Sequence, residues 1–252
     1  MDVEIRVEGA VAIITINRPE ARNAINNAVA RGMEAALMQL EADDRLKVGI
    51  ITGAGSTFCA GMDLKAYLRG ESPRTDASGF GGIVQTSCTK PLIAAIEGHA
   101  LAGGLEIALA CDFIVSSDTA RIGLPEVKLG LVAMAGGLLR LPRQLPARIA
   151  AELILSGEIL PITEFAKYGL VNRLVPEGKA LEEAITFAGK FVMNAPLAMA
   201  VSKKLLRDSR NWSEEDMFDR QEAMARPIFH SEDAREGASA FAEKRTPKWQ
   251  GR

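Results

Sequence analysis

Short apolar runs alternate with amphipathic stretches along the first half of the chain. The runs at 11–16 and 48–53 are apolar on both faces and rich in β-branched residues, and similar runs occupy 91–96 and 113–115. A strand that is covered on both faces has this composition, because neither face meets water. We therefore expect these runs to be buried strands.

Apolar residues between the first two runs recur at intervals of three and four: Ile25, Val29, Met33, Ala36, Leu37 and Leu40. This spacing places them on one face of a helix, and it predicts an amphipathic helix over 26–42. Strands alternate with helices in this way through about residue 140. The alternation is typical of an α/β core.

The second half of the chain becomes mostly helical after Pro146, and its pattern shifts again near Pro196. We expect residues 1–195 to form the core and residues 196–252 to form a helical appendage. Appendages of this kind commonly support oligomerisation, although periodicity alone does not show it.

Two serines in the appendage resemble the N-caps of helices. Ser213 precedes acidic residues at 214–216, and Ser231 precedes acidic residues at 232–233. A serine side chain can accept a hydrogen bond from a free N–H group of the first turn, and acidic residues there complement the helix dipole. The pattern predicts that a helix begins after each serine.

Residues 69–82 are rich in Gly, Ser, Asp and Pro, a composition that is typical of loops. The segment follows Asp63 and Leu64 closely in the sequence. A lid over a pocket and an ordinary surface loop are both consistent with it. We expect this segment to be mobile.

Composition and charge narrow the class of protein. The chain of 252 residues is 48% hydrophobic and 25% charged, which is the balance of a globular protein. Its net charge is −2 and its basic residues are dispersed, unlike the basic stripe of a nucleic-acid-binding protein. No apolar run approaches the roughly 20 residues of a membrane span, and no signal peptide is apparent. We expect a cytoplasmic protein that binds neither nucleic acid nor a membrane.

The cysteines and glycines do not indicate a cofactor. Cys59, Cys88 and Cys111 are odd in number and lack the spacing of metal ligands, so we expect buried free thiols in a reducing compartment. No cluster of His, Cys and Asp suggests a metal, and the Gly-Gly steps do not form a dinucleotide fingerprint. We therefore expect no metal and no separate cofactor.

Two glycine turns are candidates for binding an oxyanion. Gly103 and Gly104 precede Glu106, and a helix that begins near Gly103 would leave its first N–H groups without partners. Gly61 lies at another strand-to-helix transition, and a second N–H from this turn would complete an oxyanion hole. Removing one such donor typically costs about 3 kcal/mol of transition-state stabilisation. Tight packing and a plain turn are the alternatives for these glycines.

Two glutamates are candidates for proton transfer. Glu106 would lie in the first turn of the helix, where it can instead simply complement the helix dipole. Glu126 follows Pro125, which restricts the backbone of the preceding residue. Two carboxylates that face one site can divide acid and base roles, because their surroundings can separate their pKa values. A solvated surface charge is the alternative for Glu126.

These motifs together resemble the enoyl-CoA hydratase/isomerase, or crotonase, family, from about residue 7 to the end. The motifs that carry the resemblance are 17–19 with 23–24, 50–53, 60–64, 98–112, and 124–126 with 129–130. The resemblance implies a ClpP-like ββα superhelix core and a C-terminal helical region that forms trimers or a dimer of trimers.

The resemblance also implies a reaction. The N–H groups of Met62 and Gly103 would bind the thioester carbonyl of an acyl-CoA, and Glu106 and Glu126 would activate one water. The reaction would be the reversible hydration of a 2-enoyl-CoA, as in fatty-acid β-oxidation, with CoA entering only as part of the substrate. Substrate contacts would come from Arg22, Ala24, Ala60, Gly61, Asp63, Leu64, Leu101, Gly104, Pro125, Leu131, Met134, Phe241 and Lys244.

Two features leave the substrate open. Met134 follows Ala133 where many hydratases have Pro-Gly or Pro-Asp, and a methionine there would reshape the acyl pocket or crowd the water. The C-terminal sequence around Phe241 and Lys244 resembles that of carnitinyl-CoA dehydratases, which share both glutamates. Carnitinyl-CoA dehydration and double-bond isomerisation are therefore alternatives, as is a non-enzymatic role in binding a CoA ligand or nucleic acid.

Overall fold

The computed structural model describes the whole chain, residues 1–252. Its main sheet has six strands in the order β1 (Val3–Glu8), β2 (Val11–Ile16), β3 (Val48–Gly53), β6 (Leu92–Ile96), β8 (Phe113–Ser117) and β11 (Arg173–Val175). Only β1 and β2 are antiparallel to each other, and the remaining neighbours are parallel. The four predicted strands are confirmed as β2, β3, β6 and β8.

A second, three-stranded sheet has the order β10 (Leu160–Pro161), β9 (Arg121–Gly123) and β7 (His99–Leu101). The chain passes from β6 to β7 and then into helix α3 (Gly103–Ala110). It next passes from β8 to β9, the short 3-10 helix η2 (Pro125–Leu129) and α4 (Gly137–Gln144). Each turn of this spiral contributes one strand to each sheet, so the segments that follow β7 and β9 emerge side by side.

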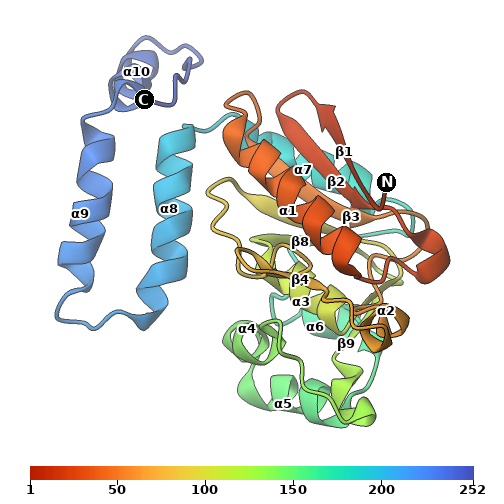
Figure 1. Cartoon of the computed structure of the whole chain (residues 1–252). Coiled ribbons are helices and arrows are strands. Elements are labelled where there is room, and N and C mark those ends of the chain that lie inside the picture. The colour runs from red at the N-terminus through yellow and green to blue at the C-terminus, as the bar shows by residue number, and fades with distance from the viewer.

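Helices cover both faces of the main sheet (Figure 1). Val11 and Ile13 of β2 pack with Ala184 and Phe187 of α7 (Ala180–Val192). The alternate residues of β2 join the larger core, to which α1 (Asn27–Ala42) contributes its apolar face. Burial on both faces explains why the strand sequences are apolar at every position. The predicted helix over 26–42 is confirmed, with Asn26 as its N-cap.

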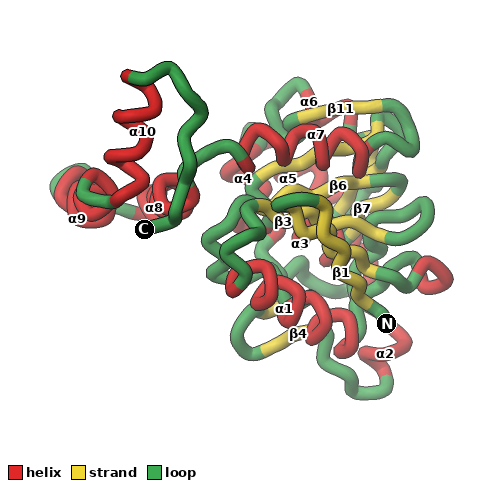
Figure 2. Tube along the Cα trace, turned by 90° about the horizontal axis from the view of Figure 1, so that it is seen from above, coloured by secondary structure: helices red, strands yellow, loops and turns green.

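The helices after residue 195 form an arm that stands apart from the core in both views (Figures 1 and 2). The arm contains α8 (Pro196–Asp208), the 3-10 helix η3 (Ser209–Asn211), α9 (Met217–Phe229) and α10 (Glu232–Ala242). Neither α8 nor α9 has a buried residue. Helices α5 (Ala147–Ser156) and α6 (Thr163–Ala166) belong instead to the core region, next to α4 and β10.

One of the two predicted helix starts in the arm is wrong. Ser231 caps α10 by accepting a hydrogen bond from the N–H of Ala234 at 3.0 Å, as its sequence pattern predicts. Ser213 does not cap a helix, because its hydroxyl donates to the Asp216 carboxylate at 2.8 Å. Residues 214–216 consequently form a turn, and α9 begins only at Met217.

The segment 69–82 differs from the mobile loop that its composition predicts. After α2 (Leu64–Leu68), it forms a small hairpin of β4 (Arg74–Thr75) and β5 (Gly79–Phe80). Residues 79–82 are buried. Gly82 has a positive φ of 68°, and a side chain there would collide with the carbonyl of Ala30. The second half of this segment is therefore packed against the core, although its composition resembles that of a surface loop.

All three cysteines are buried and free, as predicted. Burial raises the pKa of both Cys59 and Cys88 to about 12, because a thiolate loses its hydration there. No single helix is both long and apolar enough to cross a membrane. The pair formed by α7 and residues 196–211 reaches that length and apolarity only when the two helices are taken together, and the pair is bent by 109°.

A buried asparagine holds the turn that follows β3. The Asn23 side chain accepts the N–H of Arg18 at 2.9 Å and donates to the carbonyls of Ala54 at 2.9 Å and Thr57 at 2.6 Å. We expect Asn23→Ala to lower the free energy of unfolding by about 2–4 kcal/mol, because three partly buried backbone groups lose their partner. Urea denaturation measures this loss. The exposed Asn211→Ala is the control, and equal losses in the two variants would contradict the prediction.

Candidate active site

The backbone around Met62 is held in an extended conformation by Ile25. The Ile25 N–H donates to the carbonyl of Gly61 at 2.8 Å, and the Asp63 N–H donates to the carbonyl of Ile25 at 2.9 Å. In this parallel bridge both neighbours of Met62 face Ile25. The Met62 N–H therefore faces the opposite side, and it makes no backbone hydrogen bond.

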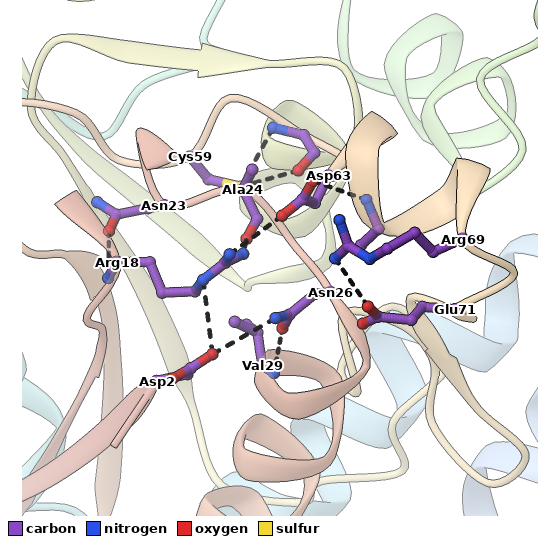
Figure 3. A network of polar contacts seen from close by, with 12 residues as sticks. Asp2, Arg18, Asn23, Ala24, Asn26, Val29, Cys59, Asp63, Arg69 and Glu71 are labelled. Carbon is purple, nitrogen blue, oxygen red and sulfur yellow. Dashed lines mark hydrogen bonds and ion pairs between the residues drawn. The ribbon is translucent and has the colours of Figure 1, made fainter. Parts of the chain in front are cut away.

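A polar network fixes the chain on the other flank of Met62 (Figure 3). The Asp63 carboxylate caps α2 by accepting the N–H of Ala66 at 3.0 Å, and it pairs with Arg18 at 3.0 Å. The Ala66 N–H and the Arg18 guanidinium hold the pKa of Asp63 below its usual value, although partial desolvation opposes them. Arg18 also donates to the carbonyl of Ala24 at 2.6 Å. These contacts fix the position of Met62 without using its N–H.

Gly61 and Gly103 lie against each other. Gly61 has a φ of 95°, and a Cβ atom there would lie 2.8 Å from the Cβ of Ala102 and 3.2 Å from the nitrogen of Gly103. Gly103 is the first residue of α3, a position whose N–H has no partner within its own helix. The structure therefore brings the two candidate donors, the N–H groups of Met62 and Gly103, into the same small region.

The turn that presents Gly103 is strained. Ala102 has a φ of 50° and a ψ of −128°, a conformation that residues other than glycine seldom adopt. Such strain typically costs about 1–3 kcal/mol and concentrates at functional sites. A side chain at Gly103 would collide with the ring of Phe80, and one at Gly104 would collide with the carbonyl of Cys59. Gly104 thus allows close packing of α3 against Cys59, which is the alternative that the sequence left open.

Glu106 is a buried carboxyl group. Its side chain points away from solvent, the residue is only 2% exposed, and its Oε1 accepts the N–H of Gly137 at 2.8 Å. Desolvation raises the pKa of Glu106 to about 7, and the charge of Glu126 adds to this effect. The N–H groups of Gly137 and Ala135 and the charge of Arg140 oppose it. Glu106 can therefore exchange a proton near neutral pH.

Glu126 lies in η2, directly after Pro125 at the start of that helix. Its Oε2 atom is buried and has no hydrogen-bond partner. Burial raises the pKa of Glu126 above its usual value. Buried carboxylate oxygens are almost always bonded, so an unpartnered one next to a second carboxyl group indicates a place for a ligand or water. The structure thus brings Glu106 and Glu126 close enough for their charges to interact.

The other residues that the resemblance singled out fall into three places. The first is the Met62 turn with the segment 22–24 beside it, where the N–H of Ala60 donates to the carbonyl of exposed Arg22 at 3.0 Å. It comprises Arg22, Ala24, Ala60, Gly61, Asp63 and Leu64. The second is formed by the end of β7, α3, η2 and the loop after η2, with Met134 78% exposed. It comprises Leu101, Gly104, Pro125, Leu131 and Met134. The third is the arm.

Phe241 and Lys244 are not brought to the two glutamates within one chain. Phe241 lies in α10 and is 88% exposed, and Lys244 follows that helix. Figure 1 shows α10 at the top end of the arm, apart from the core.

Two residues near Glu106 were missed by the sequence analysis. Gly137 donates its N–H to the carboxylate, and Arg140 lies one turn further along α4. The run of small residues at 135–137 is visible in the sequence. Nothing in its pattern shows that its backbone meets a helix that is 31 positions away.

The enoyl-CoA hydratase/isomerase family model matches residues 6–252. The chain belongs to this family. It is 41% identical to the carnitinyl-CoA dehydratase of Proteus mirabilis (strain HI4320), over 99% of this chain and 98% of that protein. It is 42% identical to the carnitinyl-CoA dehydratase of Escherichia coli (strain K12), over 97% and 96%.

Solved structures agree with this assignment. An enoyl-CoA hydratase from Mycobacterium tuberculosis H37Rv has a TM-score of 0.97 and 50% identity, covering 100% of this chain and 99% of that one. A carnitinyl-CoA hydratase from Mycobacterium avium has a TM-score of 0.79 and 41% identity, with the same coverage. The core is therefore a crotonase fold, as the resemblance implied, and the names of these relatives indicate a hydro-lyase.

The raised pKa of Glu106 has a consequence for stability. Burial shifts this pKa from 4.5 to about 7, so folding favours the protonated form and stability is lost as the pH rises through this range. We expect the wild type to lose roughly 1–3 kcal/mol relative to Glu106→Gln between about pH 5 and pH 8. Urea denaturation of both proteins at each pH measures the difference. The same pH dependence in the two proteins would contradict the assignment.

Proposed function

We propose that this protein hydrates a 2-enoyl-CoA reversibly. The observation that carries the proposal is the pairing of buried Glu106 with half-buried Glu126, whose Oε2 is buried and unpartnered, beside two backbone N–H groups that have no backbone hydrogen-bond partner. Membership of the enoyl-CoA hydratase/isomerase family supports it. A hydratase needs these two elements together, because negative charge develops on the thioester oxygen while the attacking water loses one proton and C2 gains another.

The proposed oxyanion hole consists of the N–H groups of Met62 and Gly103. They donate to the thioester oxygen, and their hydrogen bonds strengthen as the enolate forms. The donors are fixed in advance by Ile25, Asp63 and the packing of Gly61, so little reorganisation accompanies the reaction.

The two glutamates divide the proton transfers. One carboxylate takes a proton from water while the water oxygen bonds to C3, and the other carboxyl group delivers a proton to C2. The carbon–carbon double bond becomes a single bond, and the pair is reset by proton exchange. Addition of water changes no oxidation state, so CoA enters as part of the substrate and no separate cofactor is proposed.

We propose that CoA and the acyl chain run past the Met62 turn. Arg22, Ala24, Ala60, Asp63 and Leu64 lie on the side where the CoA chain would approach, and exposed Met134 lies at the acyl end. Gly61, Leu101, Gly104, Pro125 and Leu131 support these contacts from the backbone of the two turns and the loop after η2.

Removal of either carboxylate tests this proposal. We expect Glu106→Gln and Glu126→Gln each to lower kcat for crotonyl-CoA hydration by about 10²–10⁴-fold, the usual contribution of a general acid or base. Exposed Glu164→Gln is the control and should keep the wild-type rate. Full activity in both site variants would show that the mechanism is wrong. Wild-type turnover no faster than buffer would instead support a role in binding a CoA ligand.

A second candidate reaction is the dehydration of carnitinyl-CoA, which is favoured by the names of relatives at 41% and 42% identity. It would use the same two glutamates and the same oxyanion hole in the reverse direction. A panel of crotonyl-CoA, carnitinyl-CoA and a 3-enoyl-CoA distinguishes hydration, carnitinyl-CoA dehydration and isomerisation by the kcat/KM of each.

We also propose that the arm joins three copies of the chain, as one trimer or as a dimer of trimers. Helices α8 and α9 bury no residue, and Phe218, Phe229 and Phe241 are 67%, 78% and 88% exposed. A groove of about 1400 Å³ lies between α8 and the core. A second copy of the chain would cover the exposed aromatic side chains, and the arm would carry Phe241 and Lys244 to a neighbouring site.

The mass in solution tests the assembly. We expect sedimentation to give about three or six times the 27.0 kDa of one chain. Phe229→Glu should lower this mass, because a charge would be buried at the interface without a partner. Met38→Glu, at an exposed apolar position on α1, is the control and should leave it unchanged. A wild-type mass of one chain would contradict the proposal.

A further inference from the structure

Arg140 of α4 is partly buried, yet it forms no ion pair. Its Nη2 donates to the carbonyl of Val84 at 2.5 Å, and its Nη1 donates to the carbonyl of Ala135 at 3.2 Å. No carboxylate lies within ion-pair distance of its guanidinium. Burying a charge in this way is costly unless hydrogen bonds and a nearby opposite charge offset it. The position of Arg140 therefore calls for an explanation.

The guanidinium lies over the loop that holds Glu106. A side chain at Gly136, where φ is 106°, would collide with Nη1 of Arg140. The next residue, Gly137, donates its N–H to Glu106 at 2.8 Å. The loop 135–137 is thus clamped between the Arg140 guanidinium on one side and the Glu106 carboxylate on the other.

The second contact of Arg140 reaches a different wall of the site. Val84 directly follows the buried segment 79–83, whose Phe80 ring lies against Gly103. By bonding both Val84 and Ala135, Arg140 connects the segment beside the candidate oxyanion hole to the loop beside the candidate acid/base pair.

The charge of Arg140 also acts on Glu106. The ionisable groups that face Glu106 are Glu126 from η2 and Arg140 from α4. Glu126 and burial raise the pKa of Glu106, whereas Arg140 lowers it. The only other ionisable group that acts on Arg140 is the Cys111 thiol, whose pKa is raised by burial and which is therefore uncharged at neutral pH. Glu106 is therefore the main carboxyl group on which the positive charge of the Arg140 guanidinium acts.

We propose that Arg140 is a positioning residue whose guanidinium, bonded to Val84 and Ala135, fixes the 135–137 loop against Glu106 and directs a positive charge toward that carboxyl group. The effect on turnover rests on the proposed hydratase function. The effect on the Glu106 carboxyl group does not, because loop geometry and charge act on it in the free protein as well.

Titration of Glu106 in the free protein is the first test. Carbon NMR of protein labelled at the glutamate carboxyl, with the signal assigned by Glu106→Gln, follows its ionisation directly. We expect Arg140→Gln to raise the pKa of Glu106 by about 0.5–1.5 units, because an attractive charge is lost. Arg140→Lys should keep the wild-type titration. Arg143→Met, at an exposed position on the same helix, is the control. An unchanged titration in Arg140→Gln would overturn the proposal.

The pH profile of crotonyl-CoA hydration is the second test. The limb that reports Glu106 should move to higher pH in Arg140→Gln, and kcat should fall about 10–100-fold with a smaller change in KM, since misplacement acts on the chemical step. Arg140→Lys should restore the profile. A uniform fall in rate without a shift, in a folded variant, would indicate a purely structural role and would overturn the proposal. An inactive wild type that nevertheless shows the NMR shift would contradict only the proposed function.

Discussion

The site depends on the close approach of two backbone segments, 59–61 and 99–104. The N–H of Cys59 donates to the carbonyl of His99 at 3.0 Å, and the N–H of Leu101 donates back to the carbonyl of Cys59 at 3.0 Å. Gly61 and Gly104 have no side chain at the points where the segments meet, so the backbones can touch. This contact places the free N–H groups of Met62 and Gly103 together, and the remaining parts of the site are arranged around it.

Burial then determines what the two glutamates can do. Glu106 and Glu126 come from successive turns of the spiral, and the pairing of β7 with β9 brings those turns side by side. Taking two carboxyl groups out of water raises the pKa of both, and their mutual repulsion adds to the effect on Glu106. The N–H of Gly137 and the charge of Arg140 limit that rise. The same desolvation that makes the pair costly to fold makes Glu106 able to exchange a proton near neutral pH.

The arm and the core differ in how far their residues are buried within the single chain. The central strands β2, β3 and β6 are buried on both faces, whereas no residue of α8 or α9 is buried within the single chain. A chain that exposes Phe218, Phe229 and Phe241 has apolar surface that only another molecule can cover. In the proposed assembly, the same arm would carry Phe241 and Lys244 to a neighbouring copy of the chain, and assembly would then be linked to catalysis.

The sequence by itself determined the elements whose patterns are local. Runs of residues that are apolar on both faces predicted the strands β2 and β3, and apolar residues at helical spacing predicted α1. The order of the glycines and glutamates along the chain indicated the family. Only the tertiary structure decided the rest. Ser213 bonds Asp216 instead of capping a helix, Phe80 is buried in a segment with the composition of a loop, and Gly137 and Arg140 meet Glu106 from a distant turn of the chain. Each of these depends on which partner lies nearby in space, and a local pattern of residues does not contain that information.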